Sequence, residues 1–141
     1  MISNETKIEL FNTAKEMLKL SYAPYSHFHV GAALLSKDGK IYSGCNIENA
    51  AYGPSNCAER TAFFKAVSEG VLQFAGIMIV GGPDSNIKDY CPPCGVCRQV
   101  MMEFCNPDEF KIFLAKSEND IIEYTLKELL PQGFGNADLN K

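Results

Sequence analysis

Two short segments contain cysteines at a spacing that suits metal binding. They are Cys57-Ala58-Glu59 and Pro93-Cys94-Gly95-Val96-Cys97, and each lies where a helix is predicted to begin. A helix N-terminus has unpaired N–H groups and a partial positive charge, which favour the thiolate that a metal requires. Cys94 and Cys97, three residues apart in a first helical turn, can point to the same side and bind one ion. Cys57 would supply a third sulfur from the other helix.

Three sulfur ligands predict an open zinc site. A tetrahedral ion with three protein ligands keeps its fourth position for water, which is typical of catalytic zinc. Glu59 follows Cys57 by two residues, about 200° around a regular helix, so it is poorly placed to bind the same ion. We expect it to be an acid and base for the bound water. Arg60 and Arg98 would offset part of the negative charge if their side chains turn back toward the sulfurs.

The cysteine spacing by itself leaves alternatives open. Cys91 forms a second Cys-x-x-Cys pair with Cys94, and spacing cannot choose between Cys91 and Cys97 as a ligand. The cysteines could also be buried apolar residues, part of a zinc ribbon or zinc-stabilised interaction module, or a redox pair formed by Cys91 and Cys94. A ribbon needs a fourth ligand, whereas a redox protein would keep its activity after zinc removal.

Length and charge favour a small globular protein. The 141 residues are 46% hydrophobic and 21% charged, which predicts a single domain over residues 1–141. The formal net charge of -4 argues against nucleic acid or an anionic membrane surface as a partner. No apolar stretch approaches the ~20 residues of a spanning helix, and no secretory signal is visible. We predict a cytoplasmic protein with reduced thiols.

Hydrophobic periodicity predicts the elements that position the cysteines. The first is a helix that starts at Ser3 or Asn4 and stops near Ala23-Pro24. In chain order there follow strands over 28–34 and 40–45, a helix capped by Ser55 or Asn56 and running to about Glu69, a strand over 76–80, a helix over 93–104, strands over 110–115 and 121–124, and a short helix over 125–130. This order predicts a three-layer α/β/α fold with a central mixed five-stranded sheet.

Six short sequence blocks, spread over nearly the whole chain, form a wider motif that includes both cysteine segments. They are Ala-Pro-Tyr-Ser (23–26), Phe-His-Val-Gly-Ala-Ala (28–33), Asn-Ile-Glu-Asn-Ala (46–50), Cys-Ala-Glu-Arg-Thr-Ala (57–62), Pro-Cys-Gly-Val-Cys-Arg-Gln (93–99) and Leu-Leu-Pro (129–131) with Phe134. Together they resemble the small, homotetrameric, zinc-dependent cytidine deaminases. Three zinc ligands with a separate glutamate are also the general pattern of zinc deaminases.

This resemblance implies one Zn²⁺ per subunit, held by Cys57, Cys94 and Cys97, with Glu59 as the proton shuttle. The Pro-Cys-Gly-x-Cys-Arg-Gln block favours Cys97 over Cys91 as a ligand. Residues expected around the ligands are Arg60, Arg98 and Gln99. The implied substrate-binding residues are Phe28, Asn46, Glu48, Tyr52, Ala58 and Phe134.

The implied substrate residues have different roles. Asn46 and Glu48 would bind the ribose hydroxyls, since an amide and a carboxylate suit a group that donates and accepts. Ala58 would offer backbone groups to the pyrimidine, and Phe28 would pack near the nucleoside. Tyr52 and Phe134 would contribute to sites shared between subunits of a homotetramer.

The implied reaction is hydrolysis of the 4-amino group of free cytidine and deoxycytidine, which gives uridine or deoxyuridine and ammonia. This is a step of pyrimidine salvage. The alternative is the same zinc chemistry on another aminopyrimidine nucleoside-like compound, such as an antibiotic.

Overall fold

Ten helices and strands make up the part of the chain that the computed structural model describes, residues 1–139. Residues 140 and 141 of the predicted domain lie outside it. The elements are α1 (Asn4–Met17), β1 (Phe28–Ser36), β2 (Ile41–Cys45), α2 (Ala58–Ser68), β3 (Phe74–Pro83), α3 (Gly95–Phe104), β4 (Lys111–Ser117), β5 (Asp120–Thr125), α4 (Leu126–Leu129) and α5 (Asn136–Leu139).

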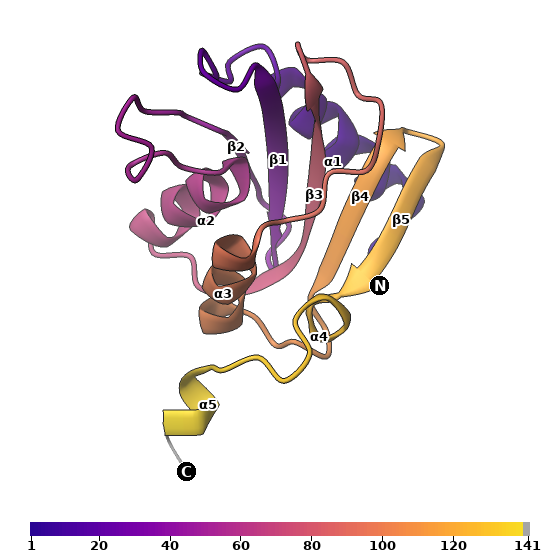
Figure 1. Ribbon diagram of the computed structural model, residues 1–141. Coiled ribbons are helices and arrows are strands. Elements are labelled where there is room, and N and C mark those ends of the chain that lie inside the picture. The colour runs from indigo at the N-terminus through magenta and orange to yellow at the C-terminus, as the bar shows by residue number, and fades with distance from the viewer. Residues whose placement is uncertain (140–141) are drawn as a thin grey trace.

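A mixed sheet occupies the centre of the fold, with strand order β2-β1-β3-β4-β5 (Figure 1). Strand β1 pairs antiparallel with both β2 and β3. Strands β3 and β4 run parallel and are joined through α3, whereas β5 returns antiparallel to β4. The predicted mixed five-stranded sheet is confirmed within the described residues.

Alternate residues of the buried strands face two separate cores. On one face, α1 packs Leu10, Phe11 and Ala14 against strand residues that include Met78 and Phe113. The other face carries the larger core, to which α2, α3 and α4 contribute. The predicted three-layer α/β/α arrangement is therefore confirmed (Figure 1). Within residues 1–139, none of the helices combines the length and hydrophobicity needed to cross a membrane.

Two predicted helix boundaries were wrong, and tertiary hydrogen bonds explain both. Helix α1 ends at Met17, not near Ala23, and the N–H of Tyr22 donates to the carbonyl of Asn46 at 3.0 Å. Helix α2 has Cys57 as its N-cap, not Ser55 or Asn56, because Asn56 exchanges backbone hydrogen bonds of 2.8 and 2.9 Å with Ile47. Helix α5 was not predicted.

Gly44 allows α2 to lie directly on β2. A Cβ at this position would lie 2.4 Å from the carbonyl oxygen of Ala58 and 2.6 Å from the backbone nitrogen of Ala62. Both are backbone atoms, so a side chain would have to push α2 away from the sheet. The Cys57-Ala58-Glu59 segment would move with it.

We predict that Gly44→Ala lowers the free energy of unfolding by about 2 kcal/mol, a typical cost of overpacking. Urea denaturation measures it. Gly53→Ala is the matched control, because its Cβ would meet nothing closer than Ala51 O at 4.0 Å; it should change stability by less than about 0.5 kcal/mol. Equal midpoints for the two variants would contradict the close approach.

Candidate active site

Three thiols from two helix N-termini meet at one point. Cys57 is the N-cap of α2, Cys94 is the N-cap of α3, and Cys97 lies in the first turn of α3. The Sγ atom of Cys94 lies 3.7 Å from that of Cys57 and 3.5 Å from that of Cys97. All three sulfurs lie within 4.8 Å of one another. Helix packing thus brings together ligands that are far apart in the sequence.

This donor set fits a zinc ion. Zinc–sulfur bonds of about 2.3 Å in tetrahedral geometry place neighbouring sulfurs about 3.8 Å apart. The observed separations of 3.7 and 3.5 Å are close to that value. Cys97 is buried and Cys94 is exposed, so the cluster lies at the edge of the core, where an ion can enter. The three thiols can therefore hold a zinc ion.

Hydrogen-bond donors near the sulfurs favour the charged thiolate. Nη2 of Arg60 donates to Sγ of Cys57 at 3.3 Å, and the backbone N–H of Cys97 donates to Sγ of Cys94 at 3.4 Å. Hydrogen bonds from the Cys97 thiol and from Arg60 lower the pKa of Cys57 to about 5. Arg60 therefore contacts a sulfur as the sequence suggested.

Arg98 and Gln99 hold the surrounding chain instead of the sulfurs. The guanidinium of Arg98 donates to the carbonyls of Pro93 and Leu129. The expectation that the Arg98 side chain turns back toward the sulfurs was therefore wrong. The hydrogen bonds of Arg98 tie the start of α3 to the end of α4. Nε2 of Gln99 donates to the carbonyl of Phe134 at 2.7 Å and so anchors the segment before α5.

Glu59 is a buried carboxyl beside the thiols. It lies in the first turn of α2, is only 4% exposed, and lines the same cavity of about 490 Å³ as Cys57 and Cys94. Burial raises the pKa of Glu59 to about 7, and the negative charge of Cys57 adds to the rise. A carboxyl with such a pKa can both take and give a proton near neutral pH.

Four of the predicted substrate-binding residues line this cavity: Asn46, Glu48, Tyr52 and Ala58. The other two, Phe28 and Phe134, are 40% and 59% exposed and are not among the described lining residues. The cavity wall also contains Val30, Cys91 and Pro92, to which sequence analysis gave no substrate role.

Cys91 lies beside the zinc ligands without joining them. The three-thiol group found among the described residues does not include it. Its Sγ packs against Gly81, where an added Cβ would lie 3.0 Å away. Burial, together with the charges of Glu59 and Cys57, raises the pKa of Cys91 to about 12. This geometry favours Cys97 as the third ligand and makes Cys91 a neutral wall residue.

Two serines support the predicted sugar-binding side chains. The hydroxyl of Ser21 donates to Oδ1 of Asn46, and the hydroxyl of Ser26 donates to Oε2 of Glu48. Neither serine is predicted to have a role from the sequence pattern. The available signal was the Ala-Pro-Tyr-Ser block, which contains Ser26 but does not reveal its partner.

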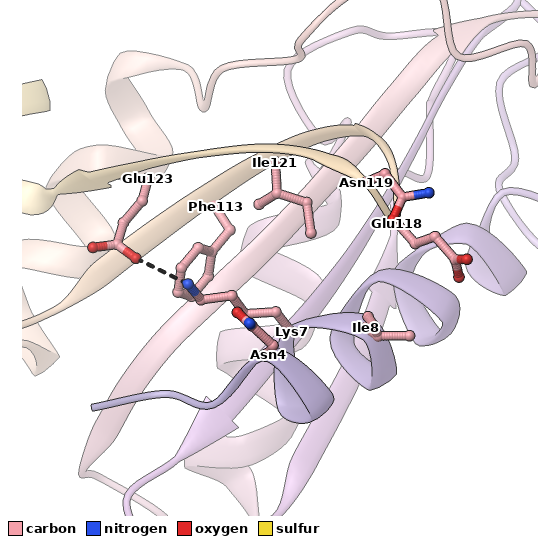
Figure 2. A pocket seen from close by; sticks show the side chains of 8 residues that line it. All are labelled: Asn4, Lys7, Ile8, Phe113, Glu118, Asn119, Ile121 and Glu123. Carbon is pink, nitrogen blue, oxygen red and sulfur yellow. Dashed lines mark ion pairs between the residues drawn. The ribbon is translucent and has the colours of Figure 1, made fainter.

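A second cavity, of about 310 Å³, lies between α1 and the β4–β5 hairpin (Figure 2). Nζ of Lys7 lies 3.6 Å from Oε1 of Glu123 and 5.4 Å from the centre of the Phe113 ring. Phe113 belongs to the core beneath α1, on the sheet face opposite the larger core that includes Cys97. The predicted zinc-binding and substrate-binding residues that line a cavity therefore line the one of about 490 Å³, and none of them lines this second one.

Comparison with known proteins identifies the class to which this fold and site belong. Residues 4–113 match the model of the cytidine and deoxycytidylate deaminase zinc-binding region. The chain belongs to this family of zinc-dependent deaminases, which confirms the resemblance inferred from the sequence blocks.

Individual relatives match this chain over most of their length. A cytidine deaminase of Sporosarcina psychrophila is 48% identical over 132 residues, 94% of this chain and 93% of the relative. A cytidine deaminase of Halalkalibacterium halodurans is 52% identical over 120 residues, which cover 85% of this chain and 87% of the relative. The crystal structure of cytidine deaminase from Burkholderia pseudomallei aligns with a TM-score of 0.80 and 44% identity, covering 89% of this chain and 97% of that one.

We predict that Cys57→Ser, Cys94→Ser and Cys97→Ser each lose most of their bound zinc, because two thiolates hold the ion far less tightly than three. Cys91→Ser is the matched control and should keep one zinc per chain. Metal analysis of the purified variants measures the stoichiometry. Zinc loss in Cys91→Ser but not in Cys97→Ser would reverse the ligand assignment.

Proposed function

We propose that this protein is a hydrolase that deaminates free cytidine and deoxycytidine to uridine and deoxyuridine and releases ammonia. The observation that carries the proposal is the buried carboxyl of Glu59 in the same cavity as the zinc-binding thiols. Zinc deaminases require this pairing of an ion with a glutamate that is not a ligand. We further propose that residues 1–141 act as one catalytic domain with one zinc ion per subunit.

Zinc, when bound, supplies a water molecule of lowered pKa. In the proposed mechanism the carboxylate of Glu59 takes a proton from the water that attacks C4 of cytosine. Glu59 then gives this proton to N3, takes the remaining proton of the former water molecule from the new C4 hydroxyl, and passes it to the departing amine, which leaves as ammonia. Its burial excludes bulk water from these transfers, and its raised pKa suits a group that alternates between base and acid.

The charges around the cavity support an uncharged nucleoside as the substrate. Glu48 and Glu59 both line the cavity. Arg60 is the one basic side chain among the described lining residues, and it donates to Cys57. A phosphate group would therefore meet two carboxylates and no free cation here. In this proposal Asn46 and Glu48 bind the sugar, while the backbone of Ala58 contacts the pyrimidine.

Three exposed aromatic side chains support a homotetramer with shared sites. Phe28, Tyr52 and Phe134 are 40%, 73% and 59% exposed in the single chain. Large aromatic groups with this exposure are suited to burial against another subunit. We propose that Phe28 packs near the nucleoside, whereas Tyr52 and Phe134 reach a neighbouring subunit's site. A cytoplasmic role in pyrimidine salvage is consistent with six free thiols.

We predict that Glu59→Gln lowers kcat at least about 100-fold while zinc stays bound, because the amide keeps the size of the side chain but cannot exchange the proton. The decrease in cytidine absorbance and the release of ammonia measure turnover. Glu69→Gln, at the exposed C-cap of α2, is the matched control and should retain wild-type turnover. A fully active, zinc-loaded Glu59→Gln variant would remove Glu59 from the mechanism.

The same assay tests the substrate class. Zinc-loaded wild-type protein should convert cytidine and deoxycytidine. Absence of turnover with both nucleosides, in a sample of verified zinc content, would contradict the proposal and favour another aminopyrimidine compound.

A further inference from the structure

The carboxylate of Glu48 is held by the turn that precedes β1. Its Oε1 atom accepts hydrogen bonds from the backbone N–H groups of Tyr25 at 3.0 Å and Ser26 at 3.1 Å. Its Oε2 atom accepts from the hydroxyl of Ser26. That hydroxyl in turn accepts from the N–H of Phe28 at 3.0 Å, so its own proton is directed to Glu48. The turn contributes three donors to one carboxylate.

The turn itself is fixed at both ends. The backbone N–H of His27 donates to the carbonyl of the buried Ala23 at 3.0 Å, and the carbonyl of His27 accepts from Asp84 at 2.8 Å. His27 has a φ of 58°, a left-handed conformation that is uncommon for a non-glycine residue. The donors that hold Glu48 are therefore pre-positioned before any substrate arrives.

Asn46 is also bound by its own chain. Its Oδ1 atom accepts from the N–H of Val30 at 2.9 Å and from the hydroxyl of Ser21. Its Nδ2 atom donates to the carbonyl of Phe28 at 2.8 Å. An amide oxygen has two lone pairs and an amide nitrogen has two hydrogens. Both lone pairs are used, so Asn46 has one N–H left to donate.

A count of the remaining hydrogen-bonding capacity defines what the pair can bind. A carboxylate has about four lone-pair sites, and the turn occupies three of those on Glu48. Glu48 can therefore accept one more proton, at Oε2, while Asn46 can donate one. Both residues line the active-site cavity. A single hydroxyl, which accepts from one neighbour and donates to the other, satisfies both.

We propose that Ser26 is a positioning residue for substrate recognition, which fixes the Glu48 carboxylate so that its remaining lone pair accepts the proton of one sugar hydroxyl. This inference rests on the proposed function and adds a residue to it. The Ser26 hydroxyl also lowers the pKa of Glu48, so the carboxylate stays an acceptor to more acidic pH than an ordinary glutamate would. Ser26 acts only through Glu48 and does not take part in proton transfer at the base.

The experiment compares cytidine with 3′-deoxycytidine and 5′-deoxycytidine, the analogues that lack one of the two sugar hydroxyls common to cytidine and deoxycytidine. In Ser26→Ala, kcat/KM for cytidine should fall about tenfold, as expected when one hydrogen bond to a charged group is lost. The loss should appear mainly in KM. For the analogue that lacks the recognised hydroxyl, kcat/KM should change less than about twofold.

Three variants separate positioning from folding. Ser26→Thr keeps the hydroxyl and should restore most of the cytidine activity, whereas Ser68→Ala, a distant exposed serine, should behave as wild type. In a Glu48→Gln background, Ser26→Ala should add less than about a twofold further loss, because the two residues act as a unit. Thermal unfolding and zinc content verify that each variant is folded and loaded.

The outcomes distinguish this inference from the function on which it rests. Three results would each overturn the role of Ser26: equal losses of kcat/KM for all three nucleosides, additive losses in the double variant, or no loss in Ser26→Ala. In each of these cases, turnover of cytidine by the wild-type protein would still uphold the proposed function. Wild-type protein that fails to convert cytidine would overturn both.

Discussion

The site depends on the convergence of two helix N-termini on one ion. Cys57 caps α2, and Cys94 and Cys97 lie at the start of α3, so the sulfur positions are set by how the two helices pack on the sheet. Gly44 allows α2 to reach β2, and the positive ends of both helices favour thiolates. Glu59 shares a helical turn with Cys57, so the packing that places the metal ligand also places the carboxyl.

Backbone pairing connects the residues proposed to bind the sugar to the three thiols. Ile47 pairs with Tyr22 on one side and with Asn56 on the other. Asn56 directly precedes Cys57, while Asn46 and Glu48 flank Ile47. The distance between the sugar and the reacting carbon of a bound nucleoside must therefore match a spacing that main-chain hydrogen bonds fix. Side chains such as Ser26 refine the orientation within that frame.

Periodicity and cysteine spacing were enough to predict the order of the main elements and the mixed sheet, but the choice of Cys97 over Cys91 as the third thiol rested on the family resemblance of the Pro-Cys-Gly-x-Cys-Arg-Gln block. They missed the N-cap of α2, because the pairing of Asn56 with Ile47 is a contact between loops that leaves no periodic pattern. They also misplaced Arg98, since sequence proximity to a ligand does not set the direction of a long side chain. Ser26 and Glu48 are 22 residues apart on two loops, and only the folded structure shows their contact.

We propose that one zinc ion, held by these three thiols, makes the chain a deaminase. Zinc titration of metal-free protein, with ammonia release from cytidine measured at each step, tests it most directly. Activity should be absent without zinc, rise in proportion to added metal, and level off at one zinc per chain. Full ammonia release from metal-free protein, or a rise that continues to several zinc ions per chain, would contradict the account.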